Sequence, residues 1–388
     1  MSWLVIFAGG GALFVVLSAI LQRWPTLLHR THRISAALRK VRVISHRGGK
    51  LVYAENTLAS FAHALKAGCD CVEFDLWRTR DGHTVIHHDP TFARLSGSNE
   101  CPDERKVSEC TFAELPRLSN ERVLAARANQ FGIRRAEQRT LFPPEGVGSD
   151  RWLRTIPELR DVLELVSNWP LSAPSDEEVP GFSTVATEKR MAEPAVLLEF
   201  KVNDAEMIRD ARTMVDALGL SKRAYWFSLI ASTNAALRLS QAITGLPPLP
   251  TISAFNDQLV YVWLWVFGLL PFVSIPDAAF AFPVGILSFA GVRRFRAADI
   301  LPDWFVHFLL CALKGSFHSA ALCEHIKRRG MITTVLIVNS LEDLQTARKI
   351  GVDCFLTDDA ALLRELTDSE LRTGLGAPRV AAPRAKEA

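Results

Sequence analysis

The sequence carries little net charge, no metal-binding cysteine pattern and no internal repeat. Its 45 lysines and arginines nearly balance its 42 acidic residues, so the formal net charge is only +3. A charge this small, without a nucleic-acid-binding motif, argues against nucleic acid as a partner. The seven cysteines include the close pair Cys69 and Cys71, but no second pair and no suitably spaced histidines accompany it. We therefore expect small buried apolar side chains there rather than zinc ligands.

Segments typical of strands and helices alternate along the chain, which favours a parallel α/β sheet covered by helices. The 388 residues are enough for one (β/α)₈ TIM barrel, which takes roughly 250 residues or more with insertions. We expect insertions or loose loops in the polar segments 94–154 and 170–194. The expected strands are 41–46, 70–76, 83–88, 196–201, 224–228, 249–254, 331–338 and 353–357.

The tetrapeptide His46-Arg47-Gly48-Gly49 directly follows the first of these strands. The end of a strand is where a TIM barrel presents its chemistry. Arg47 offers phosphate a planar fork of donors, and the two glycines allow the backbone to approach a phosphate closely. The tetrapeptide is weak evidence by itself, because His-Arg pairs are common on basic surfaces. Residues later in the chain support a functional interpretation of it.

Acidic and basic residues recur in later strand-like runs. Glu73 and Asp75 alternate by two, and Glu199 and Lys201 repeat this spacing. On a strand, such spacing puts both side chains on one face. Two carboxylates on one face repel each other unless a cation lies between them, and oxygen ligands suit Mg²⁺ or Ca²⁺ rather than zinc. With His88 ending a third run, these residue types indicate two-histidine acid/base chemistry at a metal-held phosphate.

These motifs, in this order, resemble the glycerophosphodiester phosphodiesterase family. Residues 25–29 and 268–273 further resemble the membrane-bound lysophospholipase D branch of that family. The resemblance implies a barrel enzyme that hydrolyses phosphodiesters with one divalent cation, Mg²⁺ or Ca²⁺. Besides the motifs above, the matching segments are 55–57, 155–159, 351–353 and 356–358, within a resemblance over about 41–366.

Carried over residue by residue, the resemblance implies roles for seven side chains. The expected roles are catalytic for His46 and His88, phosphate-binding for Arg47 and Lys201, and metal-ligating for Glu73, Asp75 and Glu199. One position departs from the family. Where the family usually has tryptophan in the seventh strand, this chain has Leu336, which bears on the preferred substrate.

Other polar residues in these motifs have simpler explanations. By alternation, His83 and His87 point away from the expected site. Asp89 either orients the neighbouring histidine or caps the next loop. Glu55 precedes apolar residues at helical spacing and fits a helix start, although we also expect it to lie near the site.

Residues 1–22 are expected to form a transmembrane anchor. The stretch from Trp3 to Leu21 has no charge and is about long enough to cross a bilayer. No basic residue precedes it, as would be usual in a cleaved signal peptide, so we expect it to be retained. The basic linker 23–40 predicts, by the positive-inside rule, a cytosolic barrel on the endoplasmic reticulum or another internal membrane, with attraction to anionic lipid.

An apolar insertion is expected at about 256–315, inside the barrel domain 41–366. Barrel segments precede and follow it, so a single membrane crossing is excluded there. Its tryptophans and the interruptions at Gly268 and Pro271 favour a structure lying in the membrane interface, through which an acyl chain enters the site. The alternatives are an even number of crossings or a buried helix pair over the barrel. The tail, 367–388, is expected to be disordered.

The membrane segments favour a lipid substrate. The expected reaction is that of a lysophospholipase D, which converts a lysophospholipid to lysophosphatidic acid and a free alcohol such as choline or ethanolamine. One alternative is release of glycerol 3-phosphate from soluble glycerophosphodiesters, with the apolar segments serving only as an anchor. Another is a catalytically silent membrane scaffold. The sequence determines neither the head group, the acyl chain nor the oligomeric state.

Overall fold

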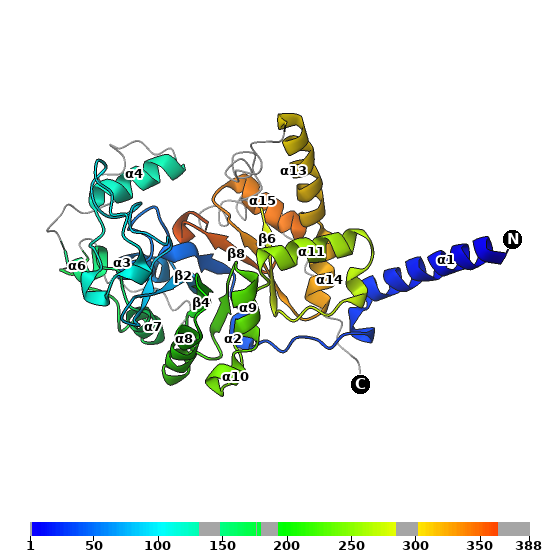
Figure 1. The fold of residues 1–388 in the computed structure, drawn as a ribbon, viewed down its shortest axis with the longest axis horizontal. Coiled ribbons are helices and arrows are strands. Elements are labelled where there is room, and N and C mark those ends of the chain that lie inside the picture. The colour runs from blue at the N-terminus through cyan, green and yellow to red at the C-terminus, as the bar shows by residue number, and fades with distance from the viewer. Residues whose placement is uncertain (1, 132–147, 176, 180–192, 285–301, 364–388) are drawn as a thin grey trace.

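The computed structural model describes residues 2–131, 148–175, 177–179, 193–284 and 302–363. A curved parallel sheet lies at its centre (Figure 1), with strand order β5-β4-β2-β1-β8-β7-β6. Single bridges from Trp226 to Thr251 and from Ile252 to Ala279 link β5 to β6 through two intervening residues. The fold is therefore a TIM-like α/β arrangement. Its strands are β1 Val43–Ser45, β2 Cys71–Arg78, β3 Thr84–Ile86, β4 Ala195–Phe200, β5 Ala224–Phe227, β6 Ala279–Pro283, β7 Ile332–Leu336 and β8 Cys354–Thr357.

Helices surround the sheet and fill the connections between strands (Figure 1). Several short ones lie in the segment 94–154, where insertions or loose loops were predicted. The α-helices are α1 Ser2–Arg23, α2 Ala36–Arg39, α3 Leu58–Lys66, α4 Asn120–Phe131, α6 Asp150–Leu153, α7 Leu159–Ser167, α8 Ala205–Ala217, α9 Ala231–Arg238, α10 Gln241–Thr244, α11 Phe255–Val266, α13 Asp303–Phe317, α14 Ala320–Arg328 and α15 Leu341–Ile350. The 3₁₀ turns are η1 Pro25–Leu27, η2 His46–Gly48, η3 Val107–Glu109, η4 Phe112–Glu114 and η5 Leu270–Phe272.

Alternate residues of each strand face opposite sides of the sheet. One side carries mostly smaller apolar residues, such as Cys71 and Leu197, which pack together as an inner cluster. The other side carries larger residues, such as Phe74, which pack against the helices. Glu73 follows Cys71 by two residues, and Glu199 follows Leu197 by two. The same alternation therefore brings both carboxylates to the inside of the barrel.

The prediction of a barrel strand at 83–88 is wrong. Residues 84–86 form β3, which pairs antiparallel with β2 and lies off the barrel path. The two strands are joined by a short turn through Asp81 and Gly82, where Gly82 has a positive φ of 94°. A connection this short can only return the chain antiparallel, because parallel strands need a crossover of a dozen or more residues.

The predicted insertion at about 256–315 is not wholly a membrane segment, because the barrel strand β6 lies within it. In β6, Phe280 and Phe282 pack among the outer residues, while Ala279 and Ala281 belong to the inner cluster. A barrel strand that is buried on both faces reads as a continuous apolar run, which explains the misassignment. The segment 249–254, predicted as a strand, contributes only the two single bridges.

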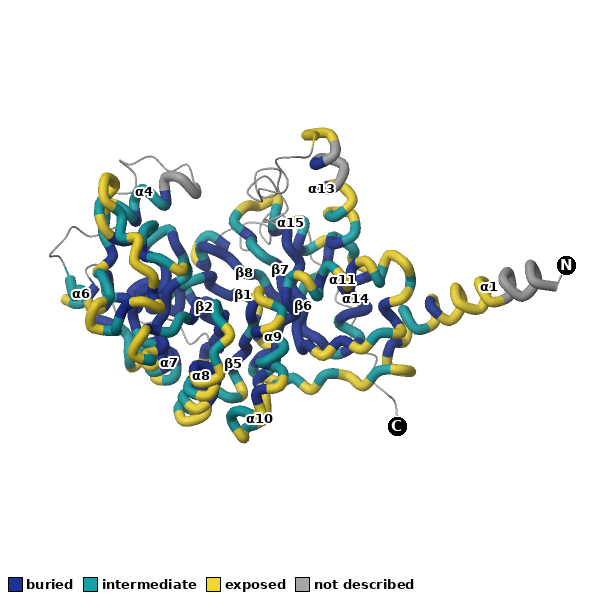
Figure 2. Tube along the Cα trace, viewed as in Figure 1, coloured by how far each residue is buried: buried dark blue, intermediate teal, exposed yellow. Residues whose placement is uncertain are grey.

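Helix α1 extends away from the barrel (Figure 1) and its second half contacts the turn after α11. Ser18 Oγ donates a hydrogen bond of 2.7 Å to the carbonyl oxygen of Gly268, and Phe14 stacks on Phe272 with ring centroids 5.8 Å apart. Many residues in both segments are exposed (Figure 2). Within the described part of the chain, no helix is long and apolar enough to cross a membrane. The predicted tail, 367–388, lies outside the described residues.

Candidate active site

The predicted site residues gather where neighbouring strands end. The register pairs Asp75 of β2 with Glu199 of β4. On the other side of β2, Ser45 of β1 pairs with Thr357 of β8. The next residues, His46 and Asp358, therefore lie side by side at the carboxyl ends of these two strands. The carboxyl ends of β1, β2, β4 and β8 thus bring together side chains that are more than a hundred residues apart in sequence.

Three buried carboxylates, Glu73, Asp75 and Glu199, each offer an oxygen within 4.8 Å of the others. Burial, with the charge of Asp75, raises the pKa of Glu73 well above its ordinary value, and burial raises that of Glu199. Burial acts in the same direction on Asp75, but Lys201 and Arg47 hold its pKa below the usual range. Lys201 Nζ lies 2.8 Å from Asp75 Oδ1 and also contacts Glu199. Among the described residues Glu73 Oε1 is buried without a hydrogen-bond partner, so the cluster fits a divalent cation.

Arg47 is tied to acids on three sides. Its backbone N donates to Glu73 Oε2 at 2.8 Å, its NH1 lies 2.8 Å from Glu55 Oε1, and its Nε lies 3.3 Å from Asp75 Oδ2. These contacts, chiefly those with Glu55, raise the pKa of Arg47 despite its burial. The guanidinium is therefore held as a permanent cation beside the carboxylate cluster, where a phosphate would need it.

The glycines after Arg47 serve the packing of the site turn. Gly48 has a φ of 75°, and a Cβ there would lie 2.9 Å from the backbone N of Phe61 in α3. A Cβ on Gly49 would lie 3.1 Å from the carbonyl oxygen of Asp358. The close backbone approach that the sequence predicted for a phosphate is thus made here with α3 and with the end of β8.

His46 is held by Asp358, for which no site role was predicted. Its Nδ1 lies 2.7 Å from Asp358 Oδ1, and Lys50 Nζ lies 2.9 Å from the same oxygen. Asn339 Nδ2 donates to the other oxygen at 2.8 Å. Burial, followed by the charges of Lys50 and Arg47, lowers the pKa of His46 to about 4. The imidazole is therefore neutral near pH 7, and Nε2 is the ring nitrogen available to a substrate.

The second histidine has an aspartate partner of its own. His88 Nδ1 lies 2.6 Å from Asp89 Oδ1, and Asp89 Oδ2 lies 2.5 Å from Arg94 Nε. Arg94 also binds both oxygens of Glu55, at 2.7 and 2.9 Å. Of the two roles considered for Asp89, orientation of His88 is the one found. Glu55, which in turn binds Arg47, lies at the site as expected.

Residues 46–362 match the family model described as "Glycerophosphoryl diester phosphodiesterase family". The chain belongs to this family. It is accordingly a phosphoric diester hydrolase. Human "Lysophospholipase D GDPD1" is 25% identical over 355 residues, which cover 91% of this chain and 93% of that protein. Mouse "Lysophospholipase D GDPD3" is 24% identical over 357 residues, covering 92% of this chain and 90% of that protein.

Solved structures agree on the fold of this phosphodiesterase. A putative glycerophosphoryl diester phosphodiesterase from Silicibacter pomeroyi aligns with a TM-score of 0.54 at 21% identity, over 88% of this chain and 96% of that one. The phosphodiesterase domain of Rv2277c from Mycobacterium tuberculosis gives a TM-score of 0.52 at 16% identity, over 84% and 99% of the two chains.

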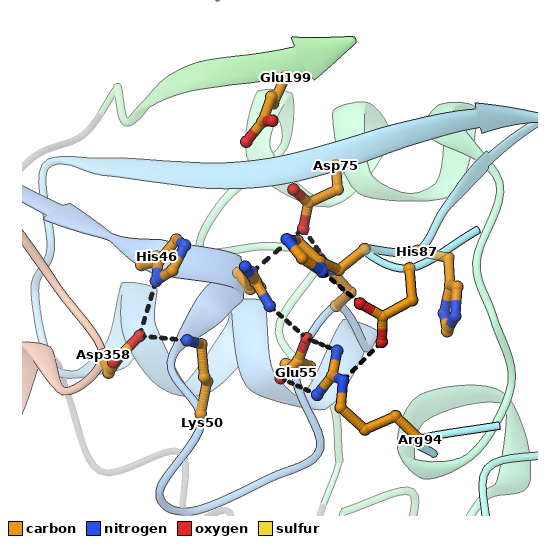
Figure 3. Close-up of polar contacts among 12 residues, drawn as sticks. His46, Lys50, Glu55, Asp75, His87, Arg94, Glu199 and Asp358 are labelled. Carbon is orange, nitrogen blue, oxygen red and sulfur yellow. Dashed lines mark hydrogen bonds and ion pairs between the residues drawn. The ribbon is translucent and has the colours of Figure 1, made fainter. Parts of the chain in front are cut away.

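The remaining histidines of the motifs lie outside the phosphodiesterase site. His87 is buried and points away from it (Figure 3), with Nε2 3.1 Å from the carbonyl oxygen of Thr91. His83 contacts Glu158 instead. Leu336, at the position where the resemblance implied tryptophan, is half-buried and packs against the inner apolar cluster. No site role was predicted for Lys50, Asn56, Arg94, Asn339 and Asp358. Asn56, whose Nδ2 donates to Asp75 Oδ2 at 2.8 Å, and Asp358 had a signal in the sequence, because they lie in the matched segments 55–57 and 356–358.

Proposed function

We propose that this phosphodiesterase hydrolyses lysophospholipids, giving lysophosphatidic acid and a head-group alcohol such as choline or ethanolamine. One observation carries the proposal: a two-histidine site around buried carboxylates occurs in the same chain as exposed apolar side chains on α1 and on the turn after α11. The relatives named lysophospholipase D support it, because their similarity covers about nine-tenths of the chain.

Glu73, Asp75 and Glu199 would hold one divalent cation, Mg²⁺ or Ca²⁺. The repulsion among their buried carboxylates and the unpartnered Glu73 Oε1 both favour such an ion. When bound, the cation would polarise the phosphate and offset its charge. Arg47 and Lys201 lie directly against these carboxylates and would bind the phosphate oxygens from the protein side.

The two histidines divide the proton transfers. His46, neutral near pH 7, accepts the proton of the free glycerol hydroxyl as that oxygen attacks phosphorus. The bond from phosphorus to the head-group oxygen breaks, and His88, which Asp89 orients through Nδ1, gives a proton to the leaving alcohol. Water then opens the cyclic phosphate to lysophosphatidic acid while the histidines exchange roles.

The exposed apolar residues give the substrate a route from a bilayer. Trp263 and Phe267 of the α11 segment are 54% and 62% exposed, and Leu13 and Val15 of α1 are 59% and 63% exposed. Apolar side chains of this kind suit the membrane interface, with Trp at headgroup level. We propose that α1 anchors the chain, that the α11 turn lies in the interface of an internal membrane, and that the basic segment 23–40 keeps the barrel on its cytosolic side.

Choline release from matched substrates by the purified full-length chain tests this function. Lysophosphatidylcholine should react and phosphatidylcholine should not, because the attacking hydroxyl is acylated in the diacyl lipid. His46→Ala serves as the inactive control, with its circular dichroism compared with that of the wild type. Equal turnover of both lipids would overturn the lysophospholipase mechanism. Faster turnover of glycerophosphocholine, unaffected by lysophosphatidylcholine as competitor, would instead assign a soluble substrate.

A further inference from the structure

The contacts of Arg94 join the phosphate-binding side of the site to its second histidine. One guanidinium binds Asp89 through Nε and Glu55 through NH1 and NH2. Each of these carboxylates also contacts a site residue: Asp89 contacts His88, and Glu55 contacts Arg47. We propose that Arg94 is a positioning residue that couples Arg47 to His88, so that phosphate binding and proton transfer depend on each other. This inference rests on the roles proposed above for those two residues.

The geometry needs the arginine side chain in particular. A guanidinium carries its donors in one rigid plane, and here the donors are divided between two carboxylates. A lysine ammonium is a single point charge on a flexible stem, so it can pair with Asp89 or with Glu55 but cannot hold both in this fixed relation. Charge alone therefore does not reproduce the bridge.

The loop that carries Arg94 is anchored in the core. Phe92 is fully buried and packs against the ring of His87, with centroids 5.4 Å apart. His87 Nε2 lies 3.1 Å from the carbonyl oxygen of Thr91. The histidine that points away from the site thus fixes the backbone from which Arg94 reaches back into it. The side chain of Arg94 is only 32% exposed, so it does not move freely on the surface.

The bridge gives a direct physical route between the two functions. A phosphate bound by Arg47 competes with Glu55 for the donors of that guanidinium. Glu55 is then left more fully to Arg94, which changes how strongly Arg94 holds Asp89 and hence how Asp89 holds His88. Changes at Glu55 and at Asp89 should therefore not act independently while Arg94 is present.

A mutant cycle with and without the bridge tests this coupling. The variants are Glu55→Gln, Asp89→Asn and their double variant, each with Arg94 and with Arg94→Met, measured as kcat and KM for choline release from lysophosphatidylcholine. With Arg94, the loss of kcat/KM in the double variant should be smaller than the product of the single losses by about threefold or more. With Arg94→Met, the losses should multiply to within about twofold. Losses that multiply in both backgrounds, or the same coupling in both, would overturn the proposal.

Two further variants separate the bridge from charge and from folding of the loop. Arg94→Lys should lose the coupling as Arg94→Met does, and full coupling in the lysine variant would refute the geometric argument. Arg122 donates to the carbonyl oxygen of Ala93 at 2.9 Å, so it holds the same loop from the other side. Arg122→Met should leave the coupling intact; if it also removes the coupling, loop stability rather than the bridge is responsible.

Binding of glycerol 3-phosphate, measured by calorimetry, keeps this inference separate from the proposed function. If the wild-type chain hydrolyses neither lysophosphatidylcholine nor glycerophosphocholine, the proposed substrates are wrong, but the same cycle can be read in Kd. Asp89→Asn should then weaken binding severalfold more when Arg94 is present than in Arg94→Met. An equal effect of Asp89→Asn in both backgrounds would contradict the coupling.

Discussion

Replacing Lys50 by methionine is expected to raise the pKa of His46 and to move the acid side of the pH–activity profile upward. Lys50 Nζ and His46 Nδ1 lie 2.9 and 2.7 Å from the same oxygen of Asp358, so their separation cannot exceed the sum of these distances. At about 5 Å and an effective dielectric constant of about 20, two unit charges repel by about 3 kcal/mol. That repulsion opposes protonation of His46, in addition to its burial.

The size of the effect follows from this repulsion. At about 1.4 kcal/mol per pKa unit, removing the lysine charge raises the pKa by up to about two units. His46, with a pKa of about 4 in the wild type, would then titrate near about 6. The kcat/KM for choline release from lysophosphatidylcholine, measured between pH 3.5 and 8, should show its acid limb shifted by this amount.

A matched variant controls for the lost contact with Asp358. Lys50→Arg keeps the charge and should leave the acid limb where the wild type has it. Removing one partner of a buried pair can cost about 3–5 kcal/mol, so thermal unfolding must show that Lys50→Met is folded at the assay temperature. An unchanged acid limb in a folded Lys50→Met protein would refute the argument that this lysine keeps His46 neutral.

Three other outcomes are expected. Glu73→Gln should reduce activity more than about a hundredfold yet raise the Tm of metal-free protein, because it removes a carboxyl whose pKa is raised by burial and then by its acidic neighbours; a lower Tm would contradict this. Trp263→Ser should weaken binding to anionic vesicles in a sedimentation assay, whereas Leu171→Ser, at a site that is 95% exposed, should not; equal binding by both variants would argue against the proposed interface. Folding lowers the pKa of His46 from 6.5 to about 4, so the neutral imidazole adds to the stability of the folded protein above pH 6.5. This contribution, at most about 3 kcal/mol, should be lost as the pH falls toward 4, which denaturant titrations would measure. His46→Gln should flatten this dependence of stability on pH.

The carboxylate cluster could be predicted from the sequence because it rests on local rules. Glu73 and Asp75 are two residues apart on one strand, and a period of two sends both to the same face. The parallel register then sets Asp75 beside Glu199. Strand geometry was therefore sufficient for Glu73 and Asp75, whereas Glu199 lies beside them because β3 leaves the barrel path and β2 pairs directly with β4.

The partners of the histidines could not be found in the same way. Asp358 contacts His46 across 312 residues of sequence, and Arg94 reaches Glu55 across 39. Neither contact has a local pattern, because each depends on how strands and loops close around the barrel. Asp89, the neighbour of His88, left two possible roles in the sequence, and its contact with Nδ1 of that histidine distinguishes them.

Apolar pattern alone misled the strand assignment in the second half of the barrel. Residues 279–283 are buried on both faces of the sheet, and such a strand has no polar alternation to separate it from a membrane segment. Conversely, 84–86 has the composition of a barrel strand but follows β2 too closely to be parallel to it. For 84–86 the length of the connection carries information that the hydrophobic pattern lacks.

Phosphorus NMR of lysophosphatidylcholine incubated with the purified chain and Mg²⁺ or Ca²⁺ tests the central claim most directly. The proposed reaction breaks the bond between phosphorus and the head-group oxygen, so the signal of lysophosphatidic acid should appear as choline is released. It should be absent with His46→Ala, with His88→Ala and in the presence of a chelator. Formation of glycerophosphocholine and fatty acid instead, or lysophosphatidic acid formation that persists without either histidine, would contradict the account.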